Sequence, residues 1–367
     1  MSAASAPSRR LNQATRLVLV QLALVALVLV AITAATALLL LAGGYSIRNG
    51  LGALWTGSLG SWYALTSATL VRSVPLLCTG VAVAIAFRAG VFNIGAEGQL
   101  LVGAAAATTV ALSKPLAVWP AGATIAVALA AAAVAGGLWA GVAALLRTRF
   151  GVLEVISTIM LNFIALHFVS YLVRGPLQEP THIYPQSATI ADSLHLPRLP
   201  GAGRLHAGLL LAIVLTAFTG WVVRHTAAGF RLMAVGENPD AAASAGQIDV
   251  GRTTTRAFLA SGALAGLAGG IELLGVTFAL YENLSPGYGF TAIAVALLAG
   301  LDPWRVLPTA VLFGALEAGA GAMQRDAGIP STLVTVIEAA LILAAVTVQA
   351  LRFSRASTGE PSIVTEP

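Results

Sequence analysis

Long apolar blocks, separated by short segments that hold nearly all the charges, constrain this chain more than any other feature. Only 10% of its 367 residues are charged, and its mean hydropathy is +0.87, whereas a soluble domain carries about 25% charged residues. Such a chain cannot cover a water-soluble surface, and a helix of about 20 apolar residues crosses a bilayer. The sequence therefore predicts an all-α, polytopic membrane protein.

Ten apolar blocks are candidates for membrane-spanning helices. With the N-terminus inside, most arginines fall in the inside segments, as the positive-inside rule requires, so we expect both termini in the cytoplasm and the protein in the plasma membrane. The third and eighth blocks are short, and each follows a segment interrupted by glycine. The expected spans are 17–42, 62–87, 98–113, 118–146, 155–173, 206–223, 257–280, 288–300, 304–323 and 331–351.

These spans divide the chain into three regions. We expect a cytoplasmic N-terminal tail over 1–16, a transmembrane domain over 17–351 and a disordered cytoplasmic tail over 352–367. Within the transmembrane domain, the proline-rich loop 175–205 is expected outside and the arginine-rich loop 224–256 inside.

Residues that the chain lacks exclude several classes of function. Cys78 is its single cysteine and its histidines show no metal-ligand spacing, so no metal site is expected. A phosphate-binding P-loop needs Gly-Lys-Ser/Thr, but the single lysine, Lys114, precedes a proline, so any ATP hydrolysis must occur on another chain. The basic residues are scattered between apolar blocks, which indicates orientation in a membrane and not binding of nucleic acid.

A glycine-rich segment, Phe87–Gln99 (FRAGVFNIGAEGQ), interrupts the apolar sequence early, and 281–289 (YENLSPGYG) does so late. Backbone that leaves a helix at membrane depth is tolerated where protein or a water-filled cavity satisfies it. Asn93, Glu97 and Gln99 are therefore candidates for lining a pathway for a polyhydroxylated solute. The alternative is a plain cytoplasmic loop between two helices.

Further polar side chains fall within the expected spans. Glu272 and Glu317 are costly in a bilayer and are expected to face a bundle interior or a cavity, which makes them candidates for the same pathway. Asn162 lies in the middle of a span, where it either lines the pathway or bonds neighbouring helices. Arg72 is expected to snorkel outward if Pro75 ends an interfacial helix before the true span.

The segment Gly236–Gly246 (GENPDAAASAG) predicts a short helix on the inner side. Asn238 is a good N-cap, Pro239 fits the first helical position and Asp240 suits the positive end of a helix. With small side chains on every face, this helix either docks in the groove of a partner and transmits force or is an ordinary surface helix.

Four sequence motifs carry a resemblance to a known family. They stand in the order FRAGVFNIGAEGQLLVGA, GVLEVISTIMLNFIAL, GENPDAAASAGQI and GYGFTAIAVALLAGLDP, and the resemblance covers roughly 60–352. Together they resemble the nucleoside and simple-sugar branch of the bacterial ABC importer permeases, and most of all the larger member of a nucleoside permease pair.

The resemblance implies partners and roles that the residue pattern alone does not show. It implies a second, homologous permease, a cytoplasmic ATPase that binds the ATP and Mg²⁺, and a lipoprotein that delivers the solute. It also implies that 236–248 is the coupling helix and that 87–99 lies near the translocation path. The residues expected to couple to the ATPase are Gly236, Glu237, Asn238, Pro239, Asp240, Ala241, Ala242 and Gly246.

We therefore predict a permease subunit that works by alternating access and carries out no bond chemistry of its own. One alternative is a permease for another solute, such as a pentose. A second is a secondary transporter or channel that works without ATP. An intramembrane enzyme is disfavoured, because the chain shows no HExxH motif, no Ser/His pair on facing spans and no catalytic carboxylate dyad.

Overall fold

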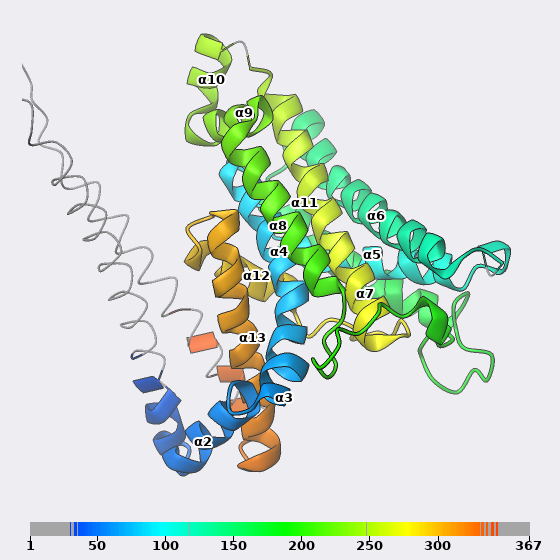
Figure 1. Cartoon of the computed structure of the whole chain (residues 1–367). Coiled ribbons are helices and arrows are strands. Elements are labelled where there is room, and N and C mark those ends of the chain that lie inside the picture. The colour runs from blue at the N-terminus through cyan, green and yellow to red at the C-terminus, as the bar shows by residue number, and fades with distance from the viewer. Residues whose placement is uncertain are drawn as a thin grey trace, which may run out of the picture. The chain divides into compact units, whose positions relative to one another are not determined.

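A computed structural model gives the arrangement of the chain (Figure 1). The structure describes residues 30, 33–34, 36–116, 118–246, 248–330, 332–333, 335–336, 339–340 and 343. The expected tails 1–16 and 352–367 and most of the first and tenth expected spans lie outside these residues. The described residues belong to two compact units, Thr56–Gly319 and the described parts of Met1–Trp55 and Ala320–Pro367.

The described residues form helices and turns and contain no β-strand. The α-helices are α2 (Ile47–Ser58), α3 (Trp62–Ala64), α4 (Leu70–Arg88), α5 (Ala96–Ala111), α6 (Ala121–Phe150), α7 (Glu154–Arg174), α8 (Gly208–His225), α9 (Ala227–Glu237), α10 (Pro239–Gly246), α11 (Val250–Glu272), α12 (Tyr288–Leu298) and α13 (Pro303–Asp326). Two π-helices, η1 (Leu65–Thr69) and η4 (Leu273–Thr277), and two 3₁₀ turns, η2 (Lys114–Leu116) and η3 (Asp192–Leu194), lie between these helices. Residues 36–42 are helical as well.

Each of the second to ninth expected spans overlaps one of these helices. Among the described residues, six helical stretches are long and apolar enough to cross a membrane, which fits a polytopic membrane protein. By contrast, α5 has 16 residues and α12 has 11, fewer than the about 20 that a full crossing needs. Both are therefore short helices that follow interruptions in the backbone.

Burial separates the spans into an inner and an outer set within the unit Thr56–Gly319. In their apolar windows, 83% of Trp62–Arg88 and 78% of Val250–Thr277 is buried, against 28% for α6 and 33% for α7 and α8. The outer helices expose large apolar side chains such as Leu138, Phe163 and Val214, which suits contact with lipid.

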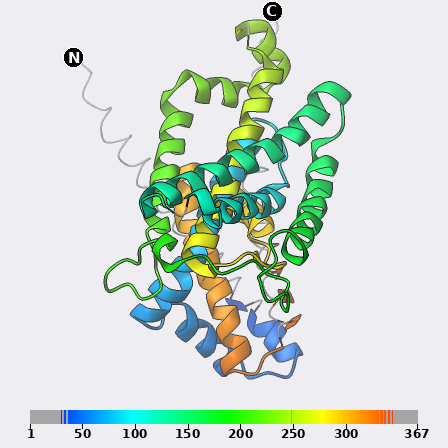
Figure 2. The same ribbon diagram turned by 90° about the vertical axis from the view of Figure 1, so that its right-hand side faces the viewer.

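Small residues allow helices of this unit to approach closely. A Cβ atom on Gly136 of α6 would lie 2.4 Å from the carbonyl oxygen of Gly262 in α11, and one on Gly103 of α5 would lie 2.4 Å from that of Gly266. Gly262 and Gly266 form a GxxxG pattern, which is typical of close helix packing in membranes. Figure 2 shows α6 crossing α11 obliquely at this contact.

The structure corrects three local expectations. Pro75 lies inside α4, so the helix that carries Arg72 does not end there. The segment expected as the inside loop 224–256 contains α9, α10 and the first turns of α11. The sequence analysis also missed α2, which lies between the first and second expected spans.

Candidate functional site

The backbone leaves the helix between α4 and α5, at residues 89–95, which we call the first break. Asn93 is fully buried there and forms a reciprocal amide pair with Gln99: its Nδ2 donates to Gln99 Oε1 (3.1 Å), and Gln99 Nε2 donates to its Oδ1 (2.9 Å). Asn93 also donates to Ser261 Oγ of α11 (2.9 Å) and accepts from the Gly95 N–H (3.0 Å). The side chain of Asn93 therefore holds the first break against α11.

Asn162 of α7 fixes the other side of the first break. Its Oδ1 accepts from the Gly98 N–H (2.8 Å), and its Nδ2 donates to the Ile94 carbonyl (2.9 Å). The hydroxyl of Thr158, one turn earlier in α7, accepts from the Ile94 N–H (3.3 Å). We call Asn93, Gln99 and Asn162 the amide cluster, because these buried side chains supply the hydrogen bonds that the broken backbone loses.

A second break covers residues 278–287, between η4 and α12. Its first residue, Phe278, has φ = 56°, a conformation that is costly for a bulky side chain. The long loop 175–205 covers this backbone: the Ile190 N–H donates to the Phe278 carbonyl, and the Ser187 N–H donates to the Leu280 carbonyl (both 2.8 Å). His195 stacks on the Phe278 ring with centroids 3.8 Å apart, so the second break is held mainly by loop backbone.

An ion pair holds the middle of the second break. The Arg174 guanidinium donates to both carboxylate oxygens of Glu282 (2.6 and 3.1 Å), and the Ser170 hydroxyl donates to the first of them. These hydrogen bonds, led by the one from Arg174, lower the pKa of Glu282 to about 2. Arg174 is largely exposed, so water and salt screen this pair.

The N-termini of the two short helices meet. The Glu97 carboxylate, in the first turn of α5, accepts from the Gly289 N–H at the start of α12 (2.7 Å). Ser285 Oγ accepts from the N–H groups of Gly287 and Tyr288 (3.2 and 3.1 Å). An anionic side chain is favourable at the positive ends of helices, so Glu97 joins the two breaks electrostatically as well as by a hydrogen bond.

Further charged residues gather around the same helix end. Glu272, Glu317 and Arg72 all lie within electrostatic range of the Tyr288 hydroxyl. Glu272 is buried, and no guanidinium lies within ion-pair distance of it in the described part of the chain. The start of α12 is therefore a second polar region inside the bundle, besides the amide cluster.

The six expected path residues thus fall into two groups. Asn93, Gln99 and Asn162 form the amide cluster, whereas Glu97, Glu272 and Glu317 surround the start of α12. The sequence analysis missed Ser261 and Tyr288. Tyr288 falls within the late interruption that the analysis noted, but a serine within an apolar helix gives no comparable signal.

The expected short helix is present as α10. Asn238 caps it, since its Oδ1 accepts from the Ala241 N–H (3.0 Å). Pro239, Asp240 and Ala241 are exposed, while Ala242 is buried. The structure therefore has one side of α10 packed and the rest available on the surface of the described chain.

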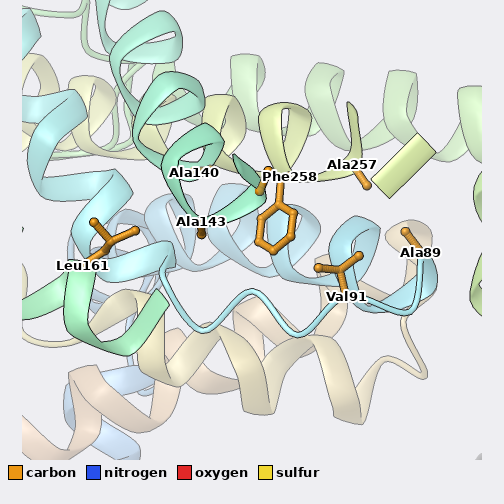
Figure 3. Close-up of a cluster of buried hydrophobic side chains, with 8 residues drawn as sticks. Ala89, Val91, Ala140, Ala143, Leu161, Ala257 and Phe258 are labelled. Carbon is orange, nitrogen blue, oxygen red and sulfur yellow. The ribbon is translucent and has the colours of Figure 1, made fainter. Parts of the chain in front are cut away.

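Gly236, just before α10, touches the start of the first break. A Cβ atom on Gly236 would lie 1.9 Å from the Arg88 carbonyl oxygen and 3.1 Å from the Gly90 nitrogen. Figure 3 shows the neighbouring apolar cluster, in which Val91 of the first break lies near Phe258 of α11. Leu232 of α9 packs against this cluster, so α9 and the first break share a contact surface.

Broken helices joined inside a lipid-exposed bundle, with an exposed short helix on one face, define a membrane transport component. The family model for the branched-chain amino acid transport system / permease component matches residues 65–346. The chain belongs to this family of ABC transporter permeases.

Curated relatives support the same assignment. The chain is 40% identical over 324 residues to the guanosine ABC transporter permease protein NupP of Bacillus subtilis, covering 87% of this chain and 91% of NupP. It is 40% identical over 308 residues to the glucose ABC transporter permease protein TsgB13 of Haloferax volcanii (81% and 79%). It is 34% identical over 316 residues to the nucleoside ABC transporter permease protein NupB of Lactococcus lactis (83% and 85%). No solved structure matches the chain.

These matches confirm the predicted class. The chain is a multi-pass plasma-membrane protein and the permease component of an ABC importer, and not an enzyme. As the permease component of a transport system, it works with other components of that system.

Proposed function

We propose that this chain carries nucleosides across the plasma membrane as one permease of a pair. The observation that carries the proposal is the 40% identity to a guanosine permease over most of both chains. The proposed partners are a second, homologous permease, an ATPase that holds ATP and Mg²⁺, and a solute-binding lipoprotein. The chain would cross the membrane ten times with both termini in the cytoplasm.

In this proposal, α10 docks on the ATPase. Motion of α10 reaches the first break through the contact of Gly236 with Arg88 and Gly90, which is close enough to leave no room for a side chain. The amide cluster then passes the displacement to α7 and α11, with which it is hydrogen-bonded.

The solute would pass the polar region at the start of α12. Glu97, Glu272 and Glu317 supply acceptors there for the hydroxyl groups of a ribose. The paired short helices fit this role, because transporters commonly form binding sites where discontinuous helices meet. The two breaks would then change their exposure alternately as the ATPase closes and opens.

A simple sugar is the alternative solute, because the sequence identity of this chain to the glucose permease TsgB13 is 40%, the same as its identity to NupP. Proteoliposomes that hold the complete importer discriminate the two. We expect ATP-dependent uptake of radiolabelled guanosine that excess unlabelled nucleosides inhibit and excess glucose does not. If glucose inhibits uptake and unlabelled nucleosides do not, a sugar is favoured as the solute. If uptake continues with a catalytically inactive ATPase, neither ATP-driven function holds.

A further inference from the structure

An apolar cavity of about 380 Å³ lies apart from the polar region described above. It is lined mainly by residues of α8 and α11. Ile85 of α4 and residues of α9 complete the lining. Figure 2 shows α9 turning away from the end of α8 toward α11. The wall residues of α8 and α11 include Leu215, Phe218, Ala260 and Leu264, so the space suits a hydrocarbon.

The cavity carries two positive charges. Arg231 of α9 and Arg256 of α11 line it, together with the Thr253 hydroxyl one turn before Arg256. In the part of the chain that the structure describes, neither arginine has a carboxylate within ion-pair distance. Two exposed guanidinium groups beside an apolar cavity match a ligand with an anionic head and a long apolar tail.

The transported solute is a poor match for this cavity. A polyhydroxylated solute would lose its hydrogen bonds to water and find few replacements on these walls, which is unfavourable for each buried hydroxyl. An acyl chain loses no hydrogen bonds there, and burying each CH₂ group is favourable. The walls and the charges therefore point to the same ligand class.

We infer that this cavity is a binding site for an anionic phospholipid, whose phosphate pairs with Arg231 and Arg256 and whose acyl chain lies between α8 and α11. The site is distinct from the proposed solute path, so the inference does not depend on which solute the importer carries. Basic pockets between membrane helices are known settings for anionic lipid headgroups.

Native mass spectrometry of the purified full-length chain tests the inference, with phosphatidylglycerol and phosphatidylcholine of identical acyl chains as probes. We expect phosphatidylglycerol to bind more tightly. The double variant Arg231→Gln/Arg256→Gln should lose this preference, because each arginine is expected to raise the affinity for phosphatidylglycerol roughly fivefold. The double variant Arg231→Lys/Arg256→Lys keeps both charges and should keep most of the preference. The matched control Arg149→Gln/Arg252→Gln removes two exposed arginines that do not line the cavity and should keep the preference.

A second variant tests the apolar part of the site. Ala260→Phe places a ring in the cavity and should weaken binding of both lipids, whereas Ala130→Phe on the exposed face of α6 should not. The inference would be overturned if the native chain bound the two lipids equally. It would also be overturned if the control variants lost as much lipid binding as the variants that change the cavity. A photo-cross-linker at position 260 that, in the assembled importer, captures a protein subunit and no lipid would overturn it too.

Discussion

The two breaks in the helices are held by different means. The first is fixed by buried side chains: Asn93 in the break itself, Gln99 of α5 and Asn162 of α7 supply its hydrogen bonds. The second is covered by the backbone of the loop 175–205 and contains Glu282, which pairs with the exposed Arg174. A buried group left without its partner costs about 1–3 kcal/mol, whereas an exposed ion pair contributes little, because water and salt screen it.

This difference indicates that the two breaks have different roles in transport. The first break contacts Gly236 and is held by buried hydrogen bonds, which suits an element that transmits a displacement from α9 and α10 to the membrane helices. The second break is less firmly held, which suits an element that opens and closes, as local opening begins where stability is lowest. Glu97 connects them, because it starts α5 and accepts from the first turn of α12.

The largest effect is expected from Asn93→Leu. This change leaves Gln99 and the buried Gly95 N–H without their partner, so we expect a loss of about 2–6 kcal/mol in the free energy of unfolding. Denaturant titration of the purified chain measures it. Asn49→Leu, at an exposed position in α2, serves as the control, and equal effects of the two changes would remove the distinction between the breaks.

Gly236→Ala tests whether the first break transmits motion. The added methyl group overlaps the Arg88 carbonyl, so α9 must shift away from the break. We expect solute uptake per ATP hydrolysed to fall roughly tenfold in the assembled importer, while ATP hydrolysis continues.

Gly251→Ala is the matched control for this change, because a Cβ atom there meets only Asp249, at 3.6 Å. It should leave uptake per ATP unchanged. Normal coupling in Gly236→Ala would show that the force reaches the membrane helices by another route.

Glu97→Gln tests the connection between the breaks. Glutamine can still accept from the Gly289 N–H, but the charge at the two helix ends is lost, which costs about 0.3–2 kcal/mol. We expect uptake to fall severalfold and the free energy of unfolding to fall by no more than this amount, whereas Glu97→Ala, which also removes the acceptor for the Gly289 N–H, should lower both further. Uptake unaffected by either substitution would remove Glu97 from the path.

The smallest effect is expected at Glu282. Because hydrogen bonds from Arg174 and Ser170 lower the pKa of Glu282 to about 2, its contribution to stability is complete above its ordinary pKa. That contribution is lost only as the pH falls toward 2. Hydrogen exchange of residues 278–287 should therefore stay constant from pH 8 to 6 after correction for intrinsic rates, and Glu282→Gln should raise it slightly. A steep change in that range would show that another group holds the second break.

Much of this architecture could be predicted from local sequence. The second to ninth expected spans, the two interruptions and the cap of α10 at Asn238 depend on neighbouring residues, and the described residues contain a helix in each of these spans, both interruptions and the cap. The partners of Asn93, Ser261 among them, come from distant helices, so spacing could not reveal them. The same holds for Gly236, because sequence shows that a glycine is present but not which backbone it approaches.

The central claim is that α10 receives force from an ATPase on the inner side of the membrane. Ala241→Cys tests it directly, since Ala241 is exposed and the single native cysteine, Cys78, is buried. In the assembled importer, we predict a disulfide cross-link from position 241 to a cysteine in the ATPase, and no labelling of intact cells by a membrane-impermeant thiol reagent. Labelling from outside the cell, with no cross-link to the ATPase, would contradict the account.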